Sequence, residues 1–76
     1  MPESRSFTAY IERDPETGLL VGFVPGLPGA HTQAESLDEL RANLAEVIEL
    51  CLEEIPTEAL ATLPEFIGLQ RIEVAL

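Results

Sequence analysis

Residues 36 to 56 read SLDELRANLAEVIELCLEEIP, and this stretch decides the fold. Its apolar side chains recur at steps of three and four residues, which places them on one face of a helix. The stripe consists of Leu37, Leu40, Leu44, Val47, Ile48, Cys51, Leu52 and Ile55. Because Pro56 disfavours helical backbone at the residue before it, the spacing predicts one amphipathic helix over residues 37–54.

Ser36 specifies where this helix starts. Its hydroxyl can accept a hydrogen bond from the backbone N–H of Glu39, and the Glu39 carboxylate can accept one from the Ser36 N–H in return. Asp38 and Glu39 also place negative charge at the positive end of the helix dipole. The sequence therefore predicts a reciprocal capping box.

Two apolar segments ahead of the helix predict a β-hairpin. In SFTAYIE, Phe7, Ala9 and Ile11 alternate with other residues, which indicates a strand over residues 6–12 with one buried face. LLVGFV predicts a second strand over residues 19–24, and RDPETG between the two supplies turn residues for antiparallel pairing. Gly22 fits a bulge, a close backbone approach or an ordinary tolerated glycine.

The stretch FVPGLPGAHTQAES, residues 23 to 36, predicts a corner between sheet and helix. Pro25 and Pro28 remove two backbone donors, and Gly26 and Gly29 permit sharp bends. The second strand must end here, and AHTQ can then form a short third strand over residues 30–33.

The residues after the helix predict one more strand. PTEALATLPEF suggests a short helical turn over residues 57–62, and the alternation in GLQRIEVAL indicates a strand over residues 69–75. The predicted order is β-β-β-α-β, a two-layer α+β fold in which one long helix covers one face of a small, mostly antiparallel sheet. At 76 residues, we expect a single domain over residues 1–76.

Acidic residues dominate the charge. The chain has 14 Asp and Glu against 4 Lys and Arg, a formal charge of −10. Such a surface repels phosphate backbones and anionic lipids, so we expect no direct contact with nucleic acid or membrane. A basic protein would be the fitting partner. The plainer alternative is that acidic residues keep a small apolar domain in solution.

The single cysteine, Cys51, excludes an internal disulfide and a cysteine-built zinc site. Its place on the apolar stripe favours a buried small hydrophobe over a reactive thiol. No apolar run reaches signal-peptide length or the roughly 18 residues of a membrane span, so we expect a cytoplasmic protein.

The candidates for catalysis are weak. His31 is the only histidine, and no second histidine, cysteine or serine triad accompanies it. Glu12, Asp14 and Glu16 cluster at the hairpin and could in principle hold magnesium, but few basic residues are available to hold a phosphate substrate. We therefore expect no enzyme activity, no metal and no cofactor.

Association with another protein is the stronger hypothesis. Alternation puts Tyr10 on the face opposite Phe7, Ala9 and Ile11, and a single helix can cover only one face of the sheet. An apolar sheet face left open, and the edge of a terminal strand, both favour a homo-oligomer. Acidic residues on the helix would steer a basic partner electrostatically, although most such faces are simply solvated.

The segment from Tyr10 to Glu54 resembles the HicB-like antitoxin family, including its short single-domain members. The resemblance rests on an ordered set of residues: Pro25, Leu27, Pro28, Gly29, Thr32, Gln33, Ser36, Glu39, Leu40 and Asn43. Ala30 stands where many members have cysteine, and Ala34 where many have glycine. Longer members carry a C-terminal DNA-binding domain, which we do not expect here.

The resemblance implies a fold and a role. The fold is a three-stranded sheet extended by the C-terminal strand, in a partial ribonuclease-H-like or double-stranded-RNA-binding-domain-like topology. The role is an antitoxin that masks a small basic HicA-type, mRNA-cleaving toxin by occlusion; the alternative is a solitary homo-oligomeric adaptor or regulatory protein without a toxin. The candidate partner-binding residues are Tyr10, Leu27, His31, Gln33, Glu35, Asp38, Glu39, Glu46, Glu49 and Glu53.

Overall fold

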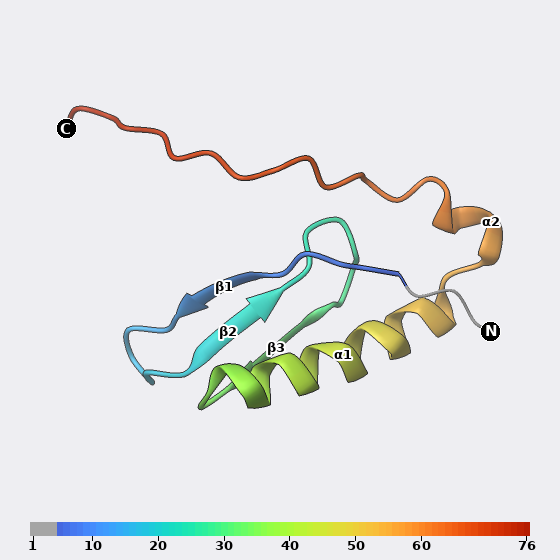
Figure 1. Cartoon of the computed structure of the whole chain (residues 1–76), viewed down its shortest axis with the longest axis horizontal. Helices are drawn as coiled ribbons and strands as arrows, with labels where there is room; N and C mark the ends of the chain where they lie inside the picture. Colours follow the sequence, from blue (N-terminus) through green and yellow to red (C-terminus); the bar gives the residue numbers. More distant parts are fainter. Residues whose placement is uncertain (1–4) are drawn as a thin grey trace.

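A computed structural model of the chain, which describes residues 5–76, has three strands followed by two helices (Figure 1). The elements are β1 (Tyr10–Arg13), β2 (Leu20–Phe23), β3 (His31–Ala34), α1 (Leu37–Glu54) and α2 (Thr57–Leu60). The strands form one antiparallel sheet in the order β1-β2-β3, and α1 packs on it through β3 and β2. The predicted α+β class, with one long helix on a small sheet, is confirmed.

The helix α1 has the predicted bounds. Ser36 is its N-cap, and the Ser36 hydroxyl accepts a hydrogen bond from the Glu39 N–H at 3.2 Å. The predicted return bond from the Ser36 N–H to the Glu39 carboxylate does not form, so the capping box is half made. The Ile55 N–H donates to the Leu52 carbonyl and closes the last turn ahead of Pro56.

The hairpin is confirmed, with strands shorter than the apolar pattern predicted. Tyr10 pairs with Phe23 and Arg13 with Leu20, so β1 begins where β2 ends. Residues 5–9 are extended but lie ahead of that pairing, because the chain turns away from the sheet after Phe23. The first strand is therefore limited to the residues that pair with β2. The third strand begins one residue later than predicted.

The corner between β2 and β3 folds into the core. The Val24 N–H donates to the Ala30 carbonyl at 2.9 Å, and the Ala30 N–H donates to the Leu27 carbonyl at 3.1 Å. Gly26 and Gly29 have positive φ values of 85° and 81°, which side chains with a Cβ rarely adopt. Val24, Leu27 and Ala30 are all buried as a result.

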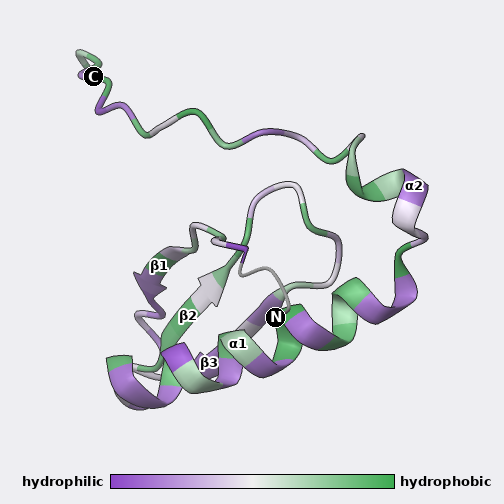
Figure 2. Cartoon of the chain, turned by 45° about the vertical axis from the view of Figure 1, so that its right-hand side comes forward, coloured by the Kyte–Doolittle hydropathy of each residue, from purple (hydrophilic) through white to green (hydrophobic). Residues whose placement is uncertain are grey.

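Among residues 5–76, the buried side chains form two small clusters. Val24, Leu27 and Ala30 form one at the corner, packed against the second half of α1. Ala34, Leu40 and Leu44 form the other, between β3 and the first half of α1. In Figure 2 the apolar and polar bands of α1 alternate along the helix, as expected of an amphipathic element.

The predicted C-terminal strand over residues 69–75 is wrong. Beyond α2, which ends two residues earlier than predicted, the chain runs extended to Leu76 without pairing to the sheet (Figures 1 and 2). Alternation predicts extended backbone, but a strand also needs an edge to pair with. Across residues 5–76, no helix is long and apolar enough to cross a bilayer.

Candidate partner-binding surface

The strand register divides the sheet into two faces. Residues that pair across strands point to the same side, and successive residues point to opposite sides. Gly22 lies beneath Leu40 and Leu44 of α1, so Gly22 and its partners Ile11 and Thr32 mark the helix side. The side away from the helix therefore carries the alternate residues.

This open face consists of two rows of three side chains, Tyr10, Phe23 and His31 in one row and Glu12, Val21 and Gln33 in the other. The Tyr10 and Phe23 rings lie with their centroids 5.2 Å apart and their planes tilted by 49°. Tyr10 is 41% exposed and Phe23 is 37% exposed, although large aromatic side chains are usually more deeply buried. The open face is thus an exposed aromatic pair with polar neighbours.

A shallow hollow of about 470 Å³ opens where β2 and β3 meet the corner. Val21, Phe23 and His31 line it from the strands, and Leu27 and Ala30 line it from the corner. Leu27 is 5% exposed, so it belongs to the floor of this hollow rather than to an exposed rim. The corner turns the Leu27 side chain into the core, and contact between Leu27 and a partner stays a prediction.

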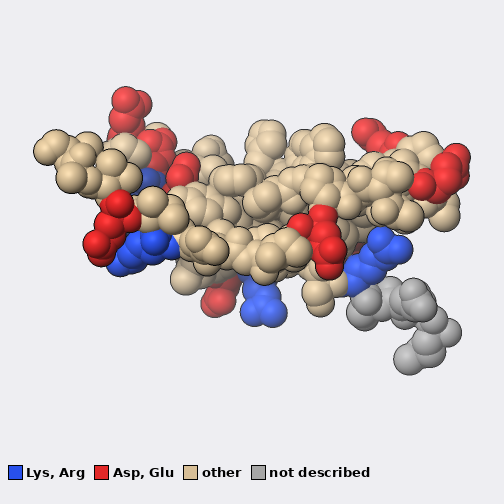
Figure 3. Space-filling view, turned by 90° about the horizontal axis from the view of Figure 1, so that it is seen from above, with Lys and Arg blue, Asp and Glu red and all other residues tan. Residues whose placement is uncertain are grey.

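The structure separates the remaining candidate residues into two surfaces. Tyr10, His31 and Gln33 lie together on the open face, where the pairing of β1, β2 and β3 brings them side by side. The acidic candidates lie on α1 and just before it, and all are exposed: Glu35, Asp38, Glu39, Glu46, Glu49 and Glu53. On the side of the molecule seen in Figure 3, which is that of the C-terminal segment, most of the visible acidic groups stand toward the two ends.

The open face also includes Phe23, which the sequence offers as either an interface aromatic or an ordinary sheet residue, and Val21 and Glu12, which were not predicted as contact residues. The signal for them is present in the sequence. Once residues 19–24 are aligned antiparallel to the first strand, Val21 and Phe23 fall on the side of Tyr10 and not on the side of Ile11.

Among the acidic residues at the hairpin, Asp14 stabilises the turn. The Asp14 carboxylate accepts hydrogen bonds from the Glu16 N–H at 3.1 Å and from the Thr17 hydroxyl at 2.9 Å. The Arg13 guanidinium donates to the Gly18 carbonyl at 2.8 Å. Within residues 5–76, no three His, Cys, Asp or Glu side chains gather closely enough to hold a metal ion. Asp14 thus has a structural role in the loop.

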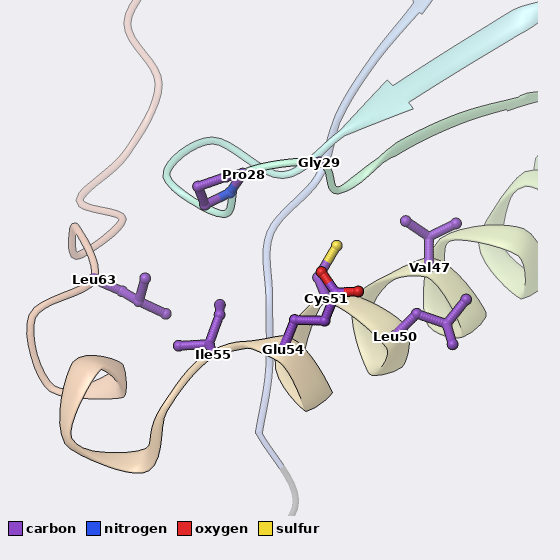
Figure 4. Close-up of a pocket in the computed structure, with 8 residues that line it drawn as sticks. All are labelled: Pro28, Gly29, Val47, Leu50, Cys51, Glu54, Ile55 and Leu63. Carbon is purple, nitrogen blue, oxygen red and sulfur yellow. The ribbon is translucent and has the colours of Figure 1, made fainter.

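A second hollow, of about 550 Å³, lies between the corner and the end of α1 (Figure 4). The half-buried thiol of Cys51 points toward Gly29 across it, and a methyl group placed on Gly29 would lie 3.6 Å from Cys51 Sγ. Val47, Ile55 and Leu63 complete its apolar wall. Cys51 therefore acts as part of the apolar packing, as its position on the stripe indicated.

The fold and the open face define a small α+β protein with one free sheet surface. The chain belongs to the UPF0150 family: it is 54% identical over 68 residues to a UPF0150 protein of Thermotoga maritima, a match covering 90% of this chain and 88% of that relative. UPF0150 proteins of Synechocystis sp. and Archaeoglobus fulgidus are 49% and 50% identical to it. These matches cover 92% and 90% of this chain, and 96% and 93% of the two relatives. No protein-family profile and no solved structure matches the chain.

Proposed function

We propose that this UPF0150 protein is a HicB-like antitoxin, which binds a small basic HicA-type toxin and masks it by occlusion. The open sheet face carries the proposal. Exposed aromatic side chains next to polar groups are the composition that protein interfaces favour, because rings bury a large apolar area while neighbouring groups fix orientation. Tyr10 and Phe23 supply the rings, and His31 and Gln33 lie beside them.

The charge of the chain supports a basic partner. With 14 acidic and 4 basic residues, the protein attracts cationic surfaces over distances of about 10 Å at 0.1 M salt. Attraction of this kind raises association rates and orients the approaching partner, but contributes less to the lifetime of the complex. The acidic residues on α1 would therefore steer the toxin, and the open face would hold it.

Steering by charge and binding by an exposed face are what an antitoxin needs, whereas a nuclease also needs catalytic groups. A protein that acts by covering its partner needs an accessible face and complementary charge; this chain has an open sheet face, and its charge of −10 would complement a basic toxin. The function is then exercised without catalysis, without a cofactor and without direct contact with nucleic acid, in the cytoplasm where an mRNA-cleaving toxin acts.

The test is recovery of the partner from cells of the organism that encodes the protein. The tagged chain is used as bait at low salt, eluted with rising salt, and the bound proteins are identified by mass spectrometry. We expect a small basic protein in near-stoichiometric amount. A bait carrying Tyr10→Ala and Phe23→Ala should lose it, whereas Leu50→Ala, which truncates a 56% exposed side chain on α1, should retain it.

The recovered protein is then assayed for mRNA cleavage with and without the antitoxin. Recovery of the bait alone would overturn the antitoxin proposal and leave a solitary homo-oligomeric adaptor or regulatory protein. The exposed apolar residues after α2 favour that second candidate, because a lone domain gains stability by covering them.

A further inference from the structure

The C-terminal segment, residues 67–76, has the alternating pattern of a β-strand but pairs with no strand of the sheet. Ile72 and Val74 alternate with Arg71 and Glu73, and each of the two apolar side chains is 73% exposed. The radius of gyration of the chain is 14.5 Å. A compact domain of this length would have about 11 Å, so the extended segment accounts for the elongated shape.

The sheet has a free edge that could receive such a strand. In the order β1-β2-β3, β1 pairs only with β2 among the strands of the described residues 5–76. The outer N–H and C=O groups of β1 are therefore left without a neighbouring strand, which is the situation that invites strand addition.

An apolar groove of about 400 Å³ runs beside this edge, between β1 and α1. We call it the edge groove; its main lining residues are Phe7, Ala9 and Ile11 from the sheet side and Leu37, Arg41 and Ile48 from α1. Ile11 is 44% exposed and Leu37 is 60% exposed. The groove thus lies where side chains of a fourth strand would meet the helix.

We propose that the C-terminal segment of a second copy of this chain fills the edge groove and pairs antiparallel with β1, and that the exchange is reciprocal. The occupant is identified by its pattern. A strand added at this edge needs apolar residues at every second position for the groove and tolerates polar residues on the open side. Residues 70–76 provide that pattern, with Ile72, Val74 and Leu76 on one side.

With Ile72 placed opposite Ile11, the charges favour antiparallel over parallel pairing. Placing Ile72 opposite Ile11 in antiparallel pairing sets Val74 opposite Ala9 and Arg71 opposite Glu12, so the apolar residues meet the groove and the ion pair lies on the open side. Opposite charges directly across a strand pair are favourable. The parallel arrangement with the same Ile72 position would instead place Glu73 beside Glu12 and Val74 beside Arg13.

The same chain cannot supply this antiparallel strand. Phe66 lines one hollow together with Ser6, Phe7 and Thr8, so the segment starts near the beginning of β1 and runs in the direction of β1 in Figure 1. In the proposed register Leu69 lies opposite Asp14, which is six residues beyond Thr8, about 20 Å along an extended chain. The three residues from Phe66 to Leu69 span at most about 11 Å. An antiparallel strand in this register must therefore come from another copy.

Disulfide trapping tests the register directly. In a background with Cys51→Ala, chains carrying Glu12→Cys are mixed with chains carrying Arg71→Cys and oxidised mildly. We expect a covalent dimer of mixed composition, and little dimer from either chain alone. A single chain carrying both Glu12→Cys and Glu73→Cys tests the parallel arrangement. If that chain closes an internal disulfide while the mixture stays monomeric, the segment pairs within its own chain and the proposal is overturned.

Sedimentation equilibrium of the full chain tests the groove. We expect a dimer of twice the 8.3 kDa chain mass. Ile72→Asp should weaken the dimer at least about tenfold, since the new carboxylate would enter an apolar groove. Ala75→Asp adds the same charge on the open side and should weaken it less than about threefold, because an exposed charge is screened. Circular dichroism should show α1 intact in both variants.

A chain that is monomeric at all concentrations would overturn the proposal, and so would equal effects of the two aspartate variants. The proposal does not depend on a toxin. Loss of the dimer with Ile72→Asp and loss of a basic partner with the Tyr10→Ala, Phe23→Ala bait are separate outcomes, so failure of one leaves the other standing.

Discussion

Gly22 of β2 lies directly beneath Leu44 of α1: a methyl group added to Gly22 would stand 3.0 Å from Leu44 Cδ1 and 3.3 Å from Leu40 Cδ2. Glycine therefore sets how closely the helix approaches the sheet. Of the interpretations that the sequence allows at this position, close approach is the one that the structure bears out.

We expect Gly22→Val to lower the free energy of unfolding by about 1–3 kcal/mol, because a larger side chain forces Leu40 and Leu44 out of their packed positions. Gly68→Val is the matched control, since nothing lies within 4 Å of a Cβ at Gly68. The control should change the free energy of unfolding by less than about 0.5 kcal/mol in urea denaturation. Equal effects would mean that α1 moves off the sheet freely.

Leu40 is fully buried and Leu50 is 56% exposed on the same helix. Leu40→Ala should cost about 2–5 kcal/mol, from lost apolar burial and the cavity left behind. Leu50→Ala removes the same atoms with the same change in helix propensity and should cost far less. Thermal and urea unfolding of the two variants checks this; similar losses would contradict the assignment of Leu40 to the core.

Because only one of the two capping bonds forms, we expect substitutions at Ser36 to lower stability more than substitutions at Glu39. Ser36→Ala removes the observed bond to the Glu39 N–H and should cost about 0.5–2 kcal/mol, whereas Ser36→Asp should restore most of it. Glu39→Gln removes no capping bond and should cost only the dipole contribution, about 0.3–1 kcal/mol. Urea denaturation compares these variants with Glu39→Ala. A clearly larger loss from Glu39→Ala than from Glu39→Gln would contradict the half-made box, because only the alanine removes the oxygen that could accept from the Ser36 N–H.

Two glycines separate backbone conformation from packing. Gly18 has φ 75° and open space around it, whereas Gly26 has φ 85° and a methyl group added there would stand 3.1 Å from Pro64 Cβ. Gly18→Ala should cost about 1–2 kcal/mol for the left-handed conformation alone. Gly26→Ala should cost more in the same unfolding experiment, because Pro64 must also shift. Identical losses would mean that residues near Pro64 move aside without resistance.

The helix could be predicted from the sequence to the residue because three local signals agree on its bounds: the apolar stripe, the Ser36 cap and Pro56. The strands could be located but not delimited. Residues 5–9 continue the alternating pattern, yet β1 begins at Tyr10 because pairing stops with Phe23 on the neighbouring strand. Where β1 begins depends on where β2 ends, so it cannot be predicted from the sequence of residues 5–13 alone.

Neither the burial of Leu27 nor the lack of strand pairing at residues 69–75 could be predicted from the local sequence. Leu27 sits among turn residues, which are usually exposed, but the bond between the Val24 N–H and the Ala30 carbonyl closes the corner and turns Leu27 inward. The alternation of residues 69–75 specifies extended backbone and one apolar side, and it does not specify whose sheet that side meets. Tyr10, by contrast, lies on the uncovered side as predicted, because alternation alone determines its side.

The two core clusters have a consequence for how the molecule opens. Ala9 is a partly buried side chain packed against both of them, one at the corner and one under the first half of α1. Each cluster alone is small, so we expect the amides of β3 and those of the corner to exchange as two groups that are coupled through this alanine. Loosening Ala9 would uncouple the two clusters, and Leu63 would move with the corner, because it packs against that cluster.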